Sequence, residues 1–253
     1  MEKAKIIANV FGIESRNGIE FIKGNREVVD MEHVSKIKSA MERGEFVPPI
    51  LIDRATKFVI DGQHRFMAAC NIWREGKPYV LSVIEGDFPN PLLSAIHYNS
   101  KSKKWETRDY VDAYIADGRE SYQILKNFCM GHKLLQGGRN EYQYKAAAQL
   151  LTGTGCSQSI SKGTLRITPE QIGVARIAYC QIEDMIRAIG PNRGAELLMK
   201  RDIVLAWLHV RDLVLSKITM QTFCKKLAKT FICPTSDQKR LFIDQYMNAY
   251  NRK

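Results

Sequence analysis

Apolar and polar residues alternate in short blocks over the first hundred positions, and this pattern predicts strands and helices in turn. A short strand is expected around residues 19–22. Asp30 can cap a helix that carries Val34 and Met41 on one stripe, and Gly44 can end it. The chain therefore begins with alternating element types.

A hairpin and a second helix follow. Residues 48–53 and 57–60 predict two strands joined by a turn at 54–56. A helix is expected from Gln63 to near Gly76, and one more strand at 79–84. Together these elements predict a compact α/β unit.

Beyond Asn90 the apolar spacing becomes helical. Long helices are expected at about 169–189, 194–215 and 236–250, with a break at Gly190-Pro191-Asn192. The predicted fold is α+β, with a small α/β domain in residues 1–98 and a basic, mainly helical domain in residues 99–253. The stripe Ile203, Ala206, Trp207 and Val210 fits core packing, a helix bundle or a homodimer interface equally well.

Charge divides the chain in the same way. Residues 1–100 hold 13 Lys and Arg against 13 Asp and Glu, whereas residues 101–253 hold 25 against 14, for a net charge of +11. A basic helical part suggests that this part binds a polyanion such as DNA. The alternative is that its lysines and arginines only keep the exposed helix faces solvated. No apolar run approaches the roughly 20 residues of a membrane span, so we expect a cytoplasmic protein that makes no membrane contact.

The cysteines are scattered and contain no CxxC pair, which predicts reduced, structural thiols. They are Cys70, Cys129, Cys156, Cys180, Cys224 and Cys233. Cys224, Cys233 and His209 do not have the spacing of a zinc finger, so no metal site is assigned.

The segment from Asp61 to Arg65 carries the strongest chemical signal. An apolar strand runs through Gly62 directly into a helix, whose first amides point outward with partial positive charge. Gly62 lets a phosphate approach the main chain, Arg65 can clamp it, and Gln63 and His64 add donors. On these residues alone, a structural histidine and an ordinary surface arginine are an equally good interpretation.

This segment resembles the signature of the ParB/sulfiredoxin superfamily, in which a Gly-x-x-Arg or Gly-Cys-His-Arg turn opens a helix and holds nucleotide phosphates. Asn25-Arg26, placed before the first helix, matches the Asn/Gln and Arg pair of ParB-like N-terminal domains. The resemblance covers roughly residues 15–90. It extends faintly to 97–105 and 109–110, a run similar to that in ParB-like proteins of phages and mobile elements.

Two departures limit what the resemblance implies. Gln63 stands where sulfiredoxins carry their reactive cysteine, so thiol chemistry is not expected. ParB proteins that hydrolyse CTP use Gly-Glu-Arg-Arg, of which Gly62 and Arg65 match and the acidic residue does not. The resemblance thus implies a nucleoside triphosphate, CTP or ATP, with or without Mg²⁺. The residues that would hold it are Asn25, Arg26, Gly62, Gln63, His64 and Arg65.

Two other functions stay open. The first is an enzyme, either a nucleoside triphosphatase, a metal-dependent nuclease or a phosphotransferase, for which His64 and Asp61 are the catalytic candidates. Asp53 and Asp61 lie on opposite strands of the predicted hairpin and could approach each other as a pair of metal ligands. The alternative is that Asp53 is an ordinary turn residue and Asp61 caps the end of its strand. The second is a non-catalytic interaction module.

Basic residues in the second part are the candidates for contacting DNA. They are Lys101, Lys103, Lys104, Lys225, Lys226, Lys229, Lys239 and Arg240. Trp105 is expected to anchor the next helix, because Tyr110 and Tyr114 continue its apolar stripe. The helix after Thr168 lacks the Arg, Asn and Gln cluster that reads base edges, so sequence-specific DNA binding is not expected.

Overall fold

A computed structural model of the protein describes residues 5–25, 30–102, 105–136, 142–190, 195–232 and 239–252. The chain forms two compact units, Met1–Gly118 and Arg119–Lys253. The boundary that we expected after residue 98 falls inside a helix of the first unit, Pro91–Ser102. The first unit mixes strands and helices, while the described part of the second is mainly helical, which confirms the α+β prediction.

One mixed sheet of five strands forms in the described part of the first unit, in the order β1-β5-β3-β4-β2. The strands are β1 (Lys5–Ile13), β2 (Glu20–Phe21), β3 (Ile50–Asp53), β4 (Phe58–Asp61) and β5 (Leu81–Asp87). β3 and β4 are antiparallel, with Leu51 opposite Asp61, so the predicted hairpin is confirmed. β1, which the sequence pattern did not predict, pairs antiparallel with β5 at one edge.

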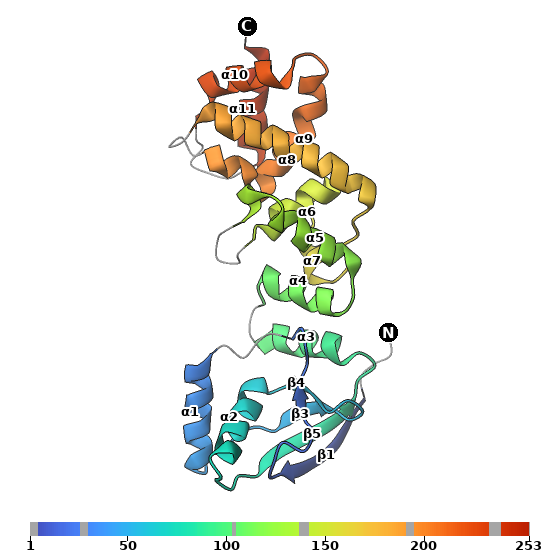
Figure 1. Cartoon of the computed structure of the whole chain (residues 1–253), viewed down its shortest axis with the longest axis vertical. Helices are drawn as coiled ribbons and strands as arrows, with labels where there is room; N and C mark the ends of the chain where they lie inside the picture. Colours follow the sequence, from blue (N-terminus) through green and yellow to red (C-terminus); the bar gives the residue numbers. More distant parts are fainter. Residues whose placement is uncertain are drawn as a thin grey trace. The chain divides into compact units, whose positions relative to one another are not determined.

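Over the described residues of this unit, four helices accompany the sheet: α1 (Met31–Glu42), α2 (Gln63–Arg74), α3 (Pro91–Ser102) and α4 (Thr107–Ala116). Asp30 caps α1 as predicted, because its Oδ1 accepts a hydrogen bond from the His33 amide at 3.0 Å. α1 and α2 lie side by side, and α3 packs against β4 (Figure 1). The start of α2 therefore lies where the hairpin, α1 and α3 meet.

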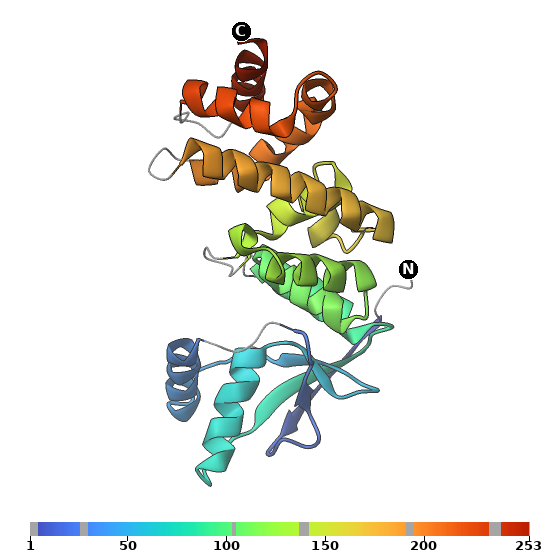
Figure 2. The same cartoon turned by 45° about the horizontal axis from the view of Figure 1, so that its top comes forward.

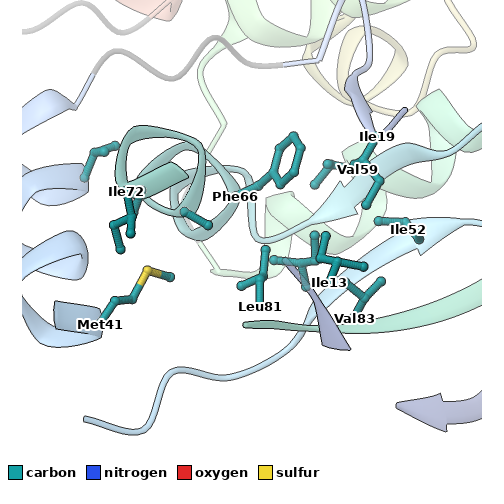
Figure 3. Close-up of a cluster of buried hydrophobic side chains, with 13 residues drawn as sticks. Ile13, Ile19, Met41, Ile52, Val59, Phe66, Ile72, Leu81 and Val83 are labelled. Carbon is teal, nitrogen blue, oxygen red and sulfur yellow. The ribbon is translucent and has the colours of Figure 1, made fainter. Parts of the chain in front are cut away.

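The core of this unit is formed by apolar side chains of α1, α2 and the sheet (Figure 3). Phe66 of α2 is fully buried, and its ring centroid lies 5.3 Å from that of Phe21. Val34 and Met41 of α1 are buried on the stripe that their spacing predicted. Because Phe66 is three residues after Gln63, this packing fixes the first turn of α2 against the sheet.

The helices of the second unit are seen in Figure 2. They are α5 (Glu120–Met130), α6 (Tyr144–Thr152), α7 (Ser157–Ser161), α8 (Pro169–Ile189), α9 (Arg201–Leu215), α10 (Met220–Thr230) and α11 (Lys239–Asn251), with 3-10 helices η1 (Lys133–Leu135) and η2 (Ala195–Met199). The helix expected over 194–215 is divided into η2 and α9. None of the helices in the described ranges is long and apolar enough to cross a membrane.

An aromatic cluster holds α9, α10 and α11 together. The ring centroid of Trp207 lies 5.3 Å from that of Phe223 and 5.6 Å from that of Tyr246. The stripe expected on α9, from Ile203 to Val210, is buried within this unit. The structure therefore supports core packing as the role of that stripe.

Candidate functional site

The β4–α2 turn, residues 61–65, has a backbone geometry that requires glycine. Gly62 has a φ of +91° and precedes the first residue of α2. A Cβ at Gly62 would lie 2.8 Å from Cγ2 of Ile50 and 3.0 Å from Nε and Nη2 of Arg65. The positive φ and this crowding both exclude larger side chains. The strand thus passes directly into the helix, and Gly62 itself is buried beneath the side chains of Ile50 and Arg65.

The start of α2 has the electrostatic character that favours an anion. Gly62 provides no side-chain cap, and the first turn of α2 contains no acidic residue. The first intrahelical hydrogen bond runs from the Phe66 amide to the Gly62 carbonyl at 2.9 Å. The amides that precede this bond belong to the first turn of α2, and at any helix start the helix itself supplies no acceptors for them. A phosphate at this position would meet donors and partial positive charge.

Arg65 lies within the turn, but its guanidinium contacts oxygens of the protein. Nη1 donates to the carbonyls of Pro48, at 3.0 Å, and Pro49, at 2.6 Å. Nη2 donates to Oδ2 of Asp61 at 2.9 Å in an ion pair. The side chain is 18% exposed. Arg65 therefore fixes the segment before β3 against the turn, a role that the sequence alone did not suggest.

A second histidine adjoins His64. The ring of His33, in the first turn of α1, lies edge-on to that of His64 with centroids 5.2 Å apart. His33 is exposed and His64 half-buried. His33 is not among the residues predicted for the site, although both histidines occupy the first turns of predicted helices. The side-by-side packing of α1 and α2 brings these first turns together.

Asn25 reaches the same region through α3. It is 7% exposed, and its Oδ1 accepts from Nδ2 of Asn99 at 3.4 Å. The same Nδ2 lies 3.4 Å from the Ile60 carbonyl, two residues before Gly62. Gln63 is 9% exposed, so its side chain is largely turned into the protein. Arg26, the remaining residue of the predicted set, lies outside the described residues.

The two carboxylates considered for metal binding have separate partners. Asp53 is buried, and its Oδ2 accepts from the Thr56 amide at 2.8 Å and from the Thr56 hydroxyl at 2.6 Å, while its Oδ1 accepts from the Phe88 amide at 3.1 Å. Asp61 is paired with Arg65. Asp53 thus acts as a turn residue, and the idea that the two carboxylates form one site is not supported.

No group of three or more His, Cys, Asp or Glu side chains within the described ranges is placed to hold a metal ion. Burial raises the pKa of the Cys129 thiol to about 12 and those of Cys156 and Cys224 to about 11. These thiols are free and protonated at neutral pH, as predicted for structural cysteines. Cys233, considered with Cys224 as a zinc ligand, lies outside the described residues.

The basic candidates near the end of the first unit are only partly described. Lys101 belongs to the last turn of α3, and Lys103 and Lys104 lie outside the described residues. Trp105 is 4% exposed, and its ring centroid is 5.3 Å from that of Tyr110 in α4. This packing supports the prediction that Trp105 anchors the following helix.

The basic candidates of the second unit differ in their surroundings. Lys225 and Lys229 are exposed one turn apart on α10, and Arg240 is exposed at the start of α11. Nζ of Lys226 donates to the Tyr250 carbonyl of α11 at 3.4 Å. Lys239 is half-buried. Lys225, Lys229 and Arg240 are therefore the members of the set most open to an external phosphate.

The division into two units sharpens the charge asymmetry. Residues 1–118 carry 17 Lys and Arg against 17 Asp and Glu, whereas residues 119–253 carry 21 against 10. The entire formal charge of +11 belongs to the helical unit. The β4–α2 turn is thus part of a neutral unit, and a polyanion would be attracted to the other one.

Comparisons with known proteins give a structural likeness. No protein-family model matches the chain, and no curated protein matches its sequence. Among solved structures, the chain is similar to the C2221 form of a Pnob8-like ParB-N domain, with 10% identity, a TM-score of 0.36 and coverage of 98% of this chain and 97% of that one. A structure of the pNOB8-like ParB N-domain has 13% identity, a TM-score of 0.37 and coverage of 87% and 94%. Identities and TM-scores this low do not assign the chain to a family.

Proposed function

We propose that the chain is a ParB-like protein that binds a nucleoside triphosphate, CTP or ATP, at the β4–α2 turn. The observation that carries the proposal is the geometry at Gly62, where a φ of +91° leads an uncapped main chain into the first turn of α2. Anions bind at helix starts of this kind because several amides and the helix dipole act on them together. The Gly62–Arg65 motif, by which the chain resembles ParB-like domains, occupies this turn.

The predicted residues that the structure describes each have a role in this proposal. The amides of Gln63 and His64 would donate to one phosphate group, and the His64 ring would contact the same group. Arg65 would turn the Nε and Nη2 edge of its guanidinium to the phosphate while Nη1 stays on the Pro48 and Pro49 carbonyls. Asn25 would support the turn through Asn99. Mg²⁺, where it accompanies the nucleotide, would be held by the phosphates themselves.

Titration calorimetry with CTP and ATP, with and without Mg²⁺, tests this proposal. Arg65→Ala should weaken binding at least tenfold, because a charge-assisted contact contributes about 1.5–3 kcal/mol. Arg108→Ala is the matched control, since Arg108 also pairs with an aspartate four residues away, Asp112, but lies in α4. Equal affinity of the Arg65→Ala variant and the wild type would exclude the assigned clamp.

We further propose that the helical unit contacts DNA through Lys225, Lys229 and Arg240. The support is the concentration of net charge in this unit and the exposure of these side chains on α10 and α11. Binding should then depend on phosphate contacts and weaken steeply with salt. Retention on DNA that is unchanged between 50 and 200 mM salt would contradict an electrostatic contact.

A double Lys225→Ala, Lys229→Ala variant should bind DNA more weakly and with a smaller salt slope, by about one unit for each lost phosphate contact. Lys162→Ala removes an exposed lysine elsewhere in the same unit and serves as the control. A double variant that binds like the control would place the contact on another surface.

A further inference from the structure

The ion pair between Asp61 and Arg65 occupies the side of the guanidinium that the proposed function assigns to a phosphate. We propose that Asp61 is an autoinhibitory latch on this site. Its carboxylate holds the Nη2 side of Arg65, and a triphosphate binds only after Asp61 has moved away. This inference rests on the proposed function, since it concerns regulation of the same site.

The hydrogen bonds of Arg65 define which side of the guanidinium is contested. Nη1 donates to the carbonyls of Pro48 and Pro49, and these two bonds use both of its hydrogens. Nε and Nη2 lie toward the turn, because a Cβ at Gly62 would be 3.0 Å from each. Asp61 Oδ2 is 2.9 Å from Nη2. A phosphate bound at the turn and the Asp61 carboxylate would therefore compete for the same donors.

The Asp61 carboxylate resembles the ligand that it would exclude. A carboxylate and a phosphate both offer two oxygens to the planar edge of a guanidinium, and both are negatively charged. With the Asp61 side chain in place, the positive charge of Arg65 is already balanced. An incoming phosphate would meet a like charge a few ångströms from its own oxygens, which lowers its affinity.

The position of Asp61 allows it to act as a latch. Asp61 is the last residue of β4, and its side chain is 40% exposed. By contrast, Asp53 on the neighbouring strand is 2% exposed and accepts three hydrogen bonds. Asp61 is therefore the more exposed partner of the ion pair. Because the β3–β4 pairing is made by main-chain groups, the Asp61 side chain can rotate into solvent while that pairing stays intact.

The test measures binding of inorganic triphosphate, CTP and ATP to the full chain by titration calorimetry. Asp61→Asn removes the charge and keeps the shape, whereas Asp61→Glu keeps the charge. Asp112→Asn is the matched control, because Asp112 pairs with Arg108 at 3.4 Å within α4. Thermal unfolding verifies that each variant is folded, and Asp61→Ser replaces Asp61→Asn if the latter is not.

We expect Asp61→Asn to bind triphosphate about tenfold more tightly than the wild type, as the removal of one nearby like charge predicts. Asp61→Glu and Asp112→Asn should stay within about twofold of the wild type. Equal or weaker binding by Asp61→Asn, next to measurable binding by the wild type, would overturn the latch and leave the proposed function standing. Absence of binding by every variant would refute the proposed function and the latch with it.

Discussion

Replacing Tyr246 with phenylalanine should stabilise the helical unit. The Tyr246 side chain is fully buried in the aromatic cluster with Trp207 and Phe223, and its hydroxyl has no hydrogen-bond partner among the described residues. Burial also raises the pKa of this phenol well above its usual range. An unpaired buried polar group costs about 1–3 kcal/mol, so the free energy of unfolding should rise by about 1 kcal/mol, or about 3–5 °C in Tm.

Tyr122 provides the matched control in the same unit. It is also fully buried, but its hydroxyl lies 3.0 Å from the carbonyls of both Ser159 and Ile160. Tyr122→Phe should therefore lower stability by about 1 kcal/mol, because a satisfied bond is lost. Urea unfolding followed by Trp fluorescence and circular dichroism measures both changes. A Tyr246→Phe variant that is destabilised as much as Tyr122→Phe would refute this reasoning.

Three further predictions concern other parts of the chain. Gly62→Ala should destabilise the first unit by more than about 2 kcal/mol in urea unfolding. Gly76 also has a positive φ but has open space around it, so Gly76→Ala should lower the free energy of unfolding by only about 1 kcal/mol. Equal losses of stability would contradict the role of crowding at Gly62. Hydrogen bonds and ion pairs with lysines lower the pKa values of Glu42 and Glu75 below the usual 4.5, so these two carboxylates stabilise the fold above that pH, and their contribution to stability is lost as the pH falls. The Tm difference between the wild type and Glu42→Gln should therefore shrink from pH 7 to pH 3. A Tm difference that stays constant would exclude this linkage. Cys180 is the exposed thiol among the described cysteines and should be alkylated first, as mass spectrometry would show; faster labelling of a buried thiol would contradict the assigned burial.

Elements with strong local signals were predictable from the sequence. α8 begins at Pro169 and ends at Ile189 as expected, because Thr168 and Gln171 form a capping box and Gly190 follows. β1 was missed because it is a strand through its pairing with β5, more than 65 residues away, and its first residues gave no alternating pattern. Local signals define single elements, whereas long-range pairing defines the edge of the sheet.

In the candidate site, too, the local elements were predictable from the sequence and the long-range contacts were not. The Gly62–Arg65 segment placed a turn and a helix start correctly, since both depend on neighbouring residues. The acceptors of Arg65 at Pro48 and Pro49, and the contact between His33 and His64, join segments 16 to 31 residues apart. Such contacts follow from how α1, α2 and the hairpin pack, and no short motif encodes them.

Backbone NMR of the full chain during titration with triphosphate tests the central claim most directly. If the β4–α2 turn holds the phosphates, the amide resonances of Gln63 and His64 should shift most, because these amides would donate to the ligand. Resonances of the same amides that stay in place at saturating triphosphate would contradict the account.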